Sequence, residues 1–362
     1  MRHKRLNKLK TSYKSITNGM SFDEWQNLVR KDVPEVYSFY VNRMQKPSST
    51  GKSVRDKLVF MRNLFNGFLQ QLSPARRIIY LFSLVFFLIA FFYNDWQIGI
   101  FAFILLNLLL AFELANKITF NEELKVARDI QNSLLPKSPP ENNNYDISCY
   151  SETAKSVGGD YYDFVHQNDD LMIAIGDISG KGMGAAIHMV QVQAIIHNLL
   201  DSHFSPKTIL THLNNNLNTL FRPGTFFTIN LASVKSDGTI QFCRAGHLPA
   251  IYYCCSTENC QNLTPKGIGI GLSRNGFFEN ALEEITITPV KGDVLVLFTD
   301  GITEAMNNYL MEYGEDRLNA VIKKNAFRNS SGIMSAIIDS IKAFTTSAPV
   351  NDDITLIVLK KN

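Results

Sequence analysis

The chain has 362 residues, more than one typical domain, so two or three structural units are expected. Its net charge of +3 hides an asymmetry, because residues 1–77 carry 16 Lys/Arg and 5 Asp/Glu whereas the remainder carries 20 and 28. No nucleic-acid-binding motif accompanies the basic segment, and the five cysteines lack the paired spacing of a zinc site. The sequence therefore supports neither a nucleic-acid-binding protein nor a zinc protein.

Residues 1–77 are predicted to form a basic cytoplasmic N-terminal region. Phe22–Tyr40 shows some helical periodicity, which Pro34 interrupts, and Lys46–Lys52 reads as a loop. No sensor domain can be recognised here. The excess of Lys and Arg suits contact with anionic lipid headgroups.

Residues 78–112 contain two apolar runs, Ile78–Tyr93 and Trp96–Phe112, separated by Asn94-Asp95. Each run is slightly shorter than the ~20 residues of a typical membrane span but inside the working range, so we expect a transmembrane helical hairpin. A pair of buried core helices is the alternative.

Basic residues flank this hairpin on both sides: Arg76 and Arg77 precede it and Lys117 follows it. Cytoplasmic loops carry an excess of Lys and Arg, so both ends of the hairpin are predicted to be cytoplasmic. The expected location is the cell inner membrane, as a multi-pass protein whose N-terminus and C-terminal domain are both cytoplasmic.

Residues 113–136 are predicted to form a linker helix. One face repeats at a 4-3-4-3 spacing and is apolar except at Gln131. A seam of two heptads is too short to identify a coiled coil, and an ordinary amphipathic helix packed on its own domain fits equally well. Pro136, Pro139 and Pro140 end the segment.

The remaining residues, 137–362, are rich in predicted strands, with two helix pairs between groups of strands, which favours an α+β layered domain. The predicted helices are Met183–Leu200, Pro206–Phe221, Tyr313–Lys323 and Ser331–Thr346. The predicted strands are Asp146–Ser151, Leu171–Gly176, Phe226–Ser233, Ile240–Arg244, Ala250–Tyr253, Glu284–Thr288, Val294–Thr299 and Ile354–Lys360.

Four aspartate motifs lie in this region: Gly158-Gly159-Asp160, Gly176-Asp177-Ile178, Thr299-Asp300-Gly301 and Asp352-Asp353-Ile354-Thr355. Each alone could be an ordinary turn. Three of them touch an apolar strand-like run, where a fold can present a carboxylate to a ligand. Several carboxylates in one place would repel each other, and hard divalent ions such as Mg²⁺ or Mn²⁺ would hold such a set together.

The order of these motifs resembles the bacterial SpoIIE/RsbU branch of the PPM metal-dependent Ser/Thr protein phosphatases, from about Glu122 to the C-terminus. Three further stretches share the resemblance: Ala127–Gln131 followed by Leu134-Leu135-Pro136, then Ala245–Pro249, and Gly271-Leu272. The resemblance implies a β-sandwich flanked by helices, an αββα stack, with metals at one end.

The resemblance also implies roles for individual residues. Asp177 would bridge two Mn²⁺ or Mg²⁺ ions, and the Ile178 carbonyl would be an adjacent ligand. Asp300 and Asp352 would be further ligands, with Asp353 less suited because neighbouring strand residues point in opposite directions. The catalytic residues would thus be Asp177 and Asp300, and Asp160 would contact the metals directly or through water.

Two other polar residues are weaker candidates for the site. Asp163 is expected in a turn or behind the ligands, and His247 is expected in a hairpin turn rather than as a general acid.

The function implied is hydrolysis of phosphoserine or phosphothreonine on a regulatory protein, such as a STAS-type anti-sigma-factor antagonist. Two metals would activate a water and neutralise phosphoryl charge, so no covalent intermediate is required. A homodimer through the linker helix is a further expectation. The alternative is a catalytically silent, membrane-tethered signalling scaffold that keeps the fold.

Overall fold

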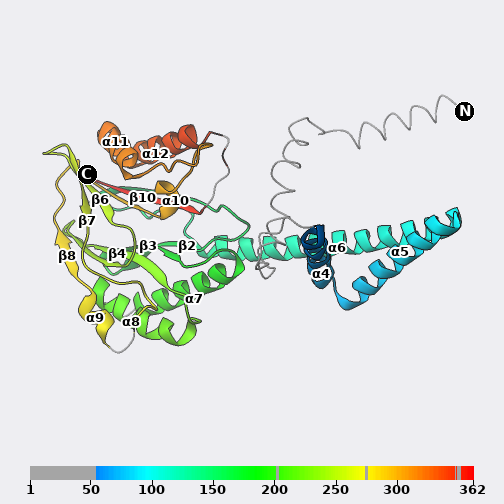
Figure 1. Cartoon of the computed structure of the whole chain (residues 1–362). Coiled ribbons are helices and arrows are strands. Elements are labelled where there is room, and N and C mark those ends of the chain that lie inside the picture. Colours follow the sequence, from blue (N-terminus) through cyan, green and yellow to red (C-terminus); the bar gives the residue numbers. More distant parts are fainter. Residues whose placement is uncertain (1–53, 201–203, 274–275, 347, 349–351) are drawn as a thin grey trace, which may run out of the picture. The chain divides into compact units, whose positions relative to one another are not determined.

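The computed structural model describes residues 54–362 except 201–203, 274–275, 347 and 349–351 (Figure 1). The chain divides into two compact units, Met1–Ile118 and Thr119–Asn362. The helical periodicity noted in Phe22–Tyr40 lies outside the described residues.

Three helices are described in the first unit: α4 (Val54–Gln71), α5 (Pro74–Tyr93) and α6 (Trp96–Leu134), the last of which continues into the second unit. The Arg77 guanidinium donates to the carbonyls of Leu69 and Leu72, at 3.0 and 3.2 Å, and so satisfies acceptors at the end of α4. Arg76 and Glu113 form a 2.9 Å ion pair between α5 and α6.

Helices α5 and α6 are each long enough to cross a membrane, and each contains an apolar 18-residue window, with mean hydropathies of 2.0 and 2.4. Within the two apolar runs, Ser83 donates to the Tyr80 carbonyl of α5 and Asn107 donates to the Phe103 carbonyl of α6. The structure thus contains two candidate membrane spans. Helix α6 runs without a break through both the second apolar run and the segment that was expected to be a separate linker helix.

The second unit contains two five-stranded antiparallel sheets. The first has the order β1-β10-β9-β6-β7 and the second β2-β3-β4-β5-β8. The strands are β1 (Tyr145–Glu152), β2 (Asp160–Gln167), β3 (Asp170–Ile178), β4 (Phe227–Val234), β5 (Ile240–Ala245), β6 (Ala250–Cys254), β7 (Asn259–Leu263), β8 (Glu284–Ile287), β9 (Val294–Phe298) and β10 (Ile354–Lys361).

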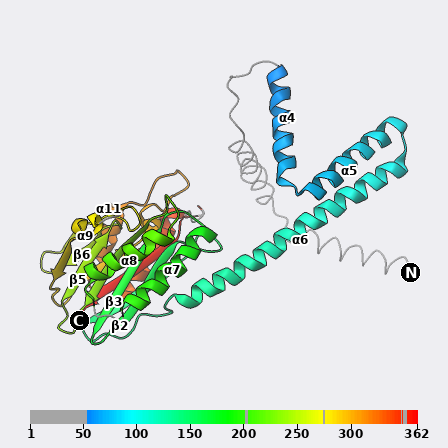
Figure 2. The same ribbon diagram turned by 90° about the horizontal axis from the view of Figure 1, so that it is seen from below.

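Helices cover the outer face of each sheet, as Figures 1 and 2 show. Helices α7 (Met183–Leu200), α8 (Pro206–Leu220) and α9 (Phe277–Ala281) pack on the second sheet through one apolar cluster. Helices α10 (Asp300–Thr303), α11 (Glu315–Asn325) and α12 (Ser330–Thr345) pack on the first sheet through another. A third cluster fills the space between the sheets. The predicted α+β fold, an αββα sandwich, is confirmed.

All eight predicted strands are present, but β2 and β7 were missed. Strand β2 begins at Asp160 and is buried over its first four residues, so its sequence does not alternate between apolar and polar positions. Strand β7 is an exposed, polar edge strand next to β6. Neither strand therefore carries the alternating pattern that marks a half-buried strand.

Candidate metal centre

The acidic residues of the first two motifs lie on neighbouring strands. Asp160 opens β2 and faces Asp177 of β3 directly in the antiparallel ladder. The backbone approaches closely here: a Cβ atom on Gly159 would lie 3.0 Å from both Asp177 Oδ1 and the Ile178 carbonyl oxygen. Glycine before Asp160 therefore keeps the side chain of Asp177 and the carbonyl of Ile178 uncrowded.

The other two motifs meet on the opposite sheet. Asp300 follows β9 and Asp353 precedes β10, and these two strands are neighbours. The Thr299 amide donates to the Thr355 carbonyl at 3.1 Å, and the Thr355 amide donates to Thr299 Oγ1 at 3.0 Å. A Cβ on Gly301 would lie only 1.9 Å from the Asp353 carbonyl oxygen, so this close approach requires glycine.

Asp160 joins the two sheets at this end of the sandwich. Its Oδ2 accepts hydrogen bonds from the hydroxyls of Thr299 (2.8 Å) and Thr355 (2.6 Å), which belong to the opposite sheet. Burial raises the pKa of Asp160 well above its usual range, the two hydroxyls oppose this, and the charge of Asp177 adds to it. Asp160 is thus a structural link as well as a member of the acidic cluster.

Asp177 is the electrostatic centre of the cluster. Its pKa is raised to about 7, first by burial and then by the negative charges of Asp300, Asp352 and Asp353. The pKa of Asp300 is also raised, by burial and by Asp352. Four carboxylates from both sheets therefore repel one another at one end of the sandwich. An all-oxygen donor set with this excess negative charge fits a hard divalent cation.

Several of these carboxylates are engaged by protein donors. Lys181 forms an ion pair with Asp352 Oδ2, and Asp353 accepts from the amides of Ala154 and Gly159, both at 2.8 Å. Within the described residues, no group of three or more His, Cys, Asp or Glu is arranged so that it could hold a metal ion. Asp177, Asp352 and Asp353 nevertheless line one pocket, together with Lys181.

Asp353 anchors the loop that leads into β2. Both of its oxygens accept loop amides, and a Cβ on Gly158 would lie 2.3 Å from Asp353 Oδ2. Asp353 therefore holds the loop in place. The carboxylate of Asp352 instead pairs with Lys181, and both residues line a pocket that Asp177 also lines.

Asp163 lies in the middle of β2 rather than in a turn. Its Oδ2 accepts from the Tyr161 hydroxyl at 3.1 Å and pairs with His197 Nε2 of α7 at 2.6 Å, and its Oδ1 accepts from the Phe164 amide. The turn assignment was wrong, because buried strand residues with polar partners resemble a polar loop in the sequence. Asp163 fastens α7 to the second sheet.

His247 is buried and hydrogen-bonded through both ring nitrogens. Its Nε2 donates to the Phe298 carbonyl at 3.1 Å, so Nδ1 accepts from the Thr228 hydroxyl at 2.8 Å. Burial lowers the pKa of His247 to about 4. The neutral imidazole links β4 to β9, and a proton-donating role is not supported by these contacts.

The contact near the site that was not predicted from the sequence is made by Gln131. This buried side chain of α6 donates from Nε2 to the Gly158 carbonyl (2.7 Å) and accepts at Oε1 from the Gly158 amide (3.1 Å). Its one sequence signal was its position as the polar residue in an otherwise apolar helix face. The linker helix therefore contacts the loop that carries Asp160.

Solved structures share this fold. The SiaA-PP2C domain of Pseudomonas aeruginosa matches with a TM-score of 0.59 and 20% identity, covering 68% of this chain and 98% of that one. The PP2C phosphatase domain and a regulatory-domain fragment of SpoIIE from Bacillus subtilis match with a TM-score of 0.51 and 18% identity, covering 61% and 64%. The two-sheet sandwich with an acidic end thus defines a PP2C-type phosphatase fold.

Sequence comparison identifies the family. The family model for stage II sporulation protein E (SpoIIE) matches residues 167–362. The phosphoserine phosphatase RsbU of Bacillus subtilis (strain 168) is 30% identical over 241 residues, which cover 66% of this chain and 70% of RsbU. Protein IcfG of Synechocystis is 27% identical over 270 residues and 42% of its length is covered. The chain belongs to the SpoIIE family, and it is an enzyme of the metal-dependent PPM class of serine/threonine phosphatases.

Proposed function

We propose that the C-terminal unit, residues 137–362, hydrolyses phosphoserine or phosphothreonine on a regulatory protein with the help of two Mn²⁺ or Mg²⁺ ions. The observation that carries this proposal is the gathering of Asp177, Asp300 and Asp352 from both sheets at one end of the sandwich. Burial, and then the negative charges of Asp300 and Asp352, raise the pKa of Asp177 to about 7, as expected of a site that binds cations.

The residues that would hold the ions follow from their positions. Asp177 and the Ile178 carbonyl lie at the end of β3, and Asp300 and Asp352 lie at strand ends of the other sheet. Bound divalent ions supply Lewis acidity and lower the pKa of water, which is the chemistry of phosphate hydrolysis without a covalent intermediate. We assign Asp177 and Asp300 as the catalytic residues and Asp160 as a residue that supports the ligands. Asp353 remains a weaker candidate ligand, because both of its oxygens hold loop amides.

Lys181 adds a positive charge to the site. It lies between Gly180 and Gly182, which both have positive φ, so the turn that presents it depends on glycine. Its ion pair with Asp352 places the ammonium group beside the acidic cluster. In this position it can bind a phosphoryl oxygen of the substrate, because an ammonium group is a point-charge phosphate binder.

The proposed substrate is a phosphorylated regulatory protein of the STAS type, an anti-sigma-factor antagonist. The support is the match to RsbU, which is described as a phosphoserine phosphatase. Purified full-length protein should release phosphate from such a protein in Mn²⁺ and should lose this activity in EDTA. If the protein hydrolyses neither an aryl phosphate nor the phosphoprotein in Mn²⁺, the result would instead indicate a silent scaffold.

We further propose a multi-pass inner-membrane protein with a cytoplasmic region at 1–77, spans within 78–112 and a linker at 113–136. The support is the length and hydropathy of α5 and α6 together with the basic flanks Arg76, Arg77 and Lys117. Exposed apolar side chains of α6, including Phe120, Val126 and Ile130, support a homodimer through the linker.

A further inference from the structure

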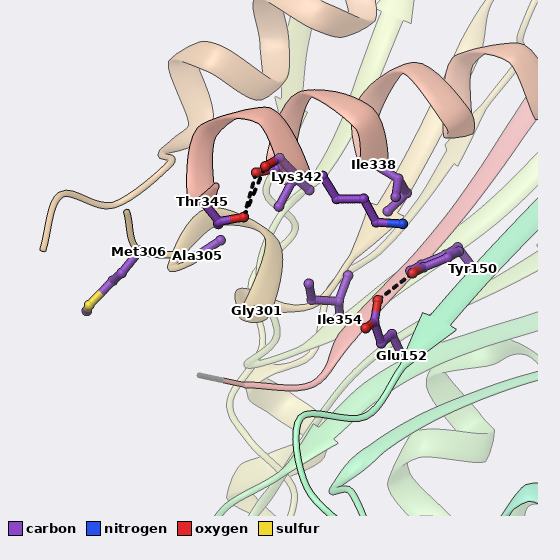
Figure 3. Close-up of a pocket in the computed structure, with 10 residues that line it drawn as sticks. Tyr150, Glu152, Gly301, Ala305, Met306, Ile338, Lys342, Thr345 and Ile354 are labelled. Carbon is purple, nitrogen blue, oxygen red and sulfur yellow. Dashed lines mark hydrogen bonds between the residues drawn. The ribbon is translucent and has the colours of Figure 1, made fainter. Parts of the chain in front are cut away.

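An apolar pocket lies beside the candidate metal centre, between the end of α10, the C-terminal half of α12 and strands β1 and β10 (Figure 3). Two of its lining residues are sequence neighbours of the acidic cluster: Gly301 follows Asp300, and Ile354 follows Asp353. Its other apolar lining residues are Ala305, Met306, Ile338 and Ile341. The pocket and the metal centre thus use the same two chain segments.

The rim of the pocket carries a lysine. In Figure 3 the Lys342 side chain extends across the pocket toward Tyr150, and its Nζ lies 5.9 Å from the centre of the Tyr150 ring. Tyr150 in turn donates its hydroxyl to Glu152. Lys342 is exposed, and no ion pair involving it occurs in the part of the chain that the structure describes. Its charge is available to a carboxylate on a partner.

An exposed apolar run begins three residues after Met306. Tyr309, Leu310 and Met311 are 85%, 80% and 52% exposed. Within the described residues of Thr119–Asn362, no other run of three large apolar residues is exposed throughout. Met306 lines the pocket, and Asn308 donates from Nδ2 to Thr346 Oγ1 at 3.1 Å, next to Thr345 of the pocket, so this loop adjoins the pocket.

The loop is held in a fixed shape that displays these side chains. Asn307 Oδ1 accepts from the amides of Tyr309 (2.9 Å) and Met311 (3.1 Å), and the Asn307 amide donates to the Met311 carbonyl. Leu310 has φ +59°, a left-handed conformation that costs a non-glycine residue about 1–2 kcal/mol. The loop thus keeps its apolar side chains exposed to solvent despite the backbone strain at Leu310.

The base of the loop is fastened to the helix that lines the pocket. The Tyr313 hydroxyl donates to Ser340 Oγ of α12 at 2.8 Å. The Arg317 guanidinium, which donates to the Tyr313 carbonyl at 2.7 Å, lies 4.7 Å from the Phe344 ring centre. Loop and pocket therefore keep a constant relative position.

The surroundings favour a protein partner over a lipid surface. Glu312 ends the loop, and Glu304, whose amide donates to the Asp300 carbonyl at 2.8 Å, lies between the loop and the acidic cluster. Such an acidic neighbourhood repels anionic headgroups. Exposed tyrosine, leucine and methionine beside a preformed pocket suit a protein interface.

We propose that the docking surface, formed by this pocket, Lys342 and Tyr309–Met311, binds the folded body of the phosphoserine protein whose phosphate is hydrolysed at the neighbouring metal centre. An aliphatic side chain of that protein fills the pocket, and one of its carboxylates pairs with Lys342. This inference rests on the proposed function and adds the means by which a protein substrate is distinguished from a small phosphate ester.

The test compares two substrates of the full-length protein in lipid nanodiscs with Mn²⁺: p-nitrophenyl phosphate and a phosphorylated STAS-domain protein. The variants are Tyr309→Ser/Leu310→Asn, in which asparagine suits the left-handed position, and Lys342→Glu. The control is Phe327→Ser, which removes a side chain 79% exposed just before the opposite end of α12. Both docking variants should lower kcat/KM for the phosphoprotein at least tenfold and leave that for p-nitrophenyl phosphate within twofold, and the control should change neither.

Equal kcat/KM for the phosphoprotein in wild type and docking variants would overturn the inference, as would equal losses on both substrates. A change confined to vesicle binding or to self-association would overturn it in favour of a lipid surface or a second copy. If the wild type hydrolyses neither substrate, the proposed function itself fails, so the two failures are distinguishable.

Discussion

Gln131 forms two hydrogen bonds with Gly158, one to the carbonyl at 2.7 Å and one from the amide at 3.1 Å. Through them α6 fixes the peptide backbone two residues before Asp160. The other side of the same loop is held by Asp353, which accepts the Gly159 amide at 2.8 Å. The position of the loop therefore depends on a residue of the linker helix as well as on the metal-site end of the sandwich.

Gln131→Leu should weaken the response of the enzyme to metal. The leucine fills a similar volume but leaves the Gly158 amide and carbonyl without partners, which costs about 1–3 kcal/mol per buried group. We expect the Mn²⁺ concentration for half-maximal turnover to rise at least tenfold. Ser133→Ala, which removes a bond within α6 alone, is the control. An unchanged Mn²⁺ titration would mean that α6 is a passive tether.

Asp177→Asn should abolish turnover and stabilise the metal-free protein. The substitution removes the charge at the centre of the repelling cluster, so we expect activity to fall at least ~10²-fold, as for loss of a metal-centred mechanism, and the metal-free Tm to rise by at least ~3 °C. Asp170→Asn, which breaks an ion pair with Lys235 at the other end of β3, should leave turnover nearly intact. More than a tenth of wild-type activity in Asp177→Asn would refute the assignment.

The stability gain from Asp177→Asn should depend on pH in a defined direction. The pKa of Asp177 is about 7 in the folded protein and 3.8 ordinarily, so the folded state binds the extra proton between these values. Wild-type metal-free stability therefore falls as pH rises from 4 to 7 because of this group. Chemical denaturation should show a difference between variant and wild type that grows over this window and is constant above it. A pH-independent difference would contradict the burial and repulsion at Asp177.

His247 should change the stability with pH in the opposite direction. Its pKa is about 4 when folded and 6.5 ordinarily, so its stabilising effect is complete above pH 6.5 and is lost as pH falls toward 4. His247→Gln should be destabilised at pH 7.5, where the bonds to Phe298 and Thr228 are lost, and should approach wild type near pH 4. Parallel stability curves across this range would show that folding does not lower the pKa of His247.

Reporter fusions at residues 1 and 362 should both report the cytoplasm. The basic flanks of the hairpin, Arg76, Arg77 and Lys117, predict this topology. A periplasmic signal from either end would refute it.

Eight strands could be predicted from the sequence, among them β3, β9 and β10, which are apolar runs bounded by turn residues. Their stacking in a sandwich was implied by the family resemblance alone. Strand β2 could not be predicted. Tyr161 is buried in the core and Asp163 is buried against His197, so the strand lacks the alternation of a half-buried strand. The acidic residues of the site could be named from their motifs. Their different roles could not be predicted, because they depend on which carboxylate oxygens accept from Thr299, Thr355 and Gly159. These partners lie 139 to 195 positions away in the sequence, and only the fold brings them close.

The link from Asp160 to the hydroxyls of Thr299 and Thr355 affects how substitutions at this residue can be interpreted. The same carboxylate closes the end of the sandwich and faces Asp177 across the ladder. Loss of activity on replacing Asp160 would thus mix an opened sheet interface with a damaged site. Replacing Thr299 by valine separates these effects, because it removes one hydroxyl partner and leaves every carboxylate in place. Asp160 therefore serves both the fold and the site, and Thr299→Val measures how much of the activity depends on the link between the sheets.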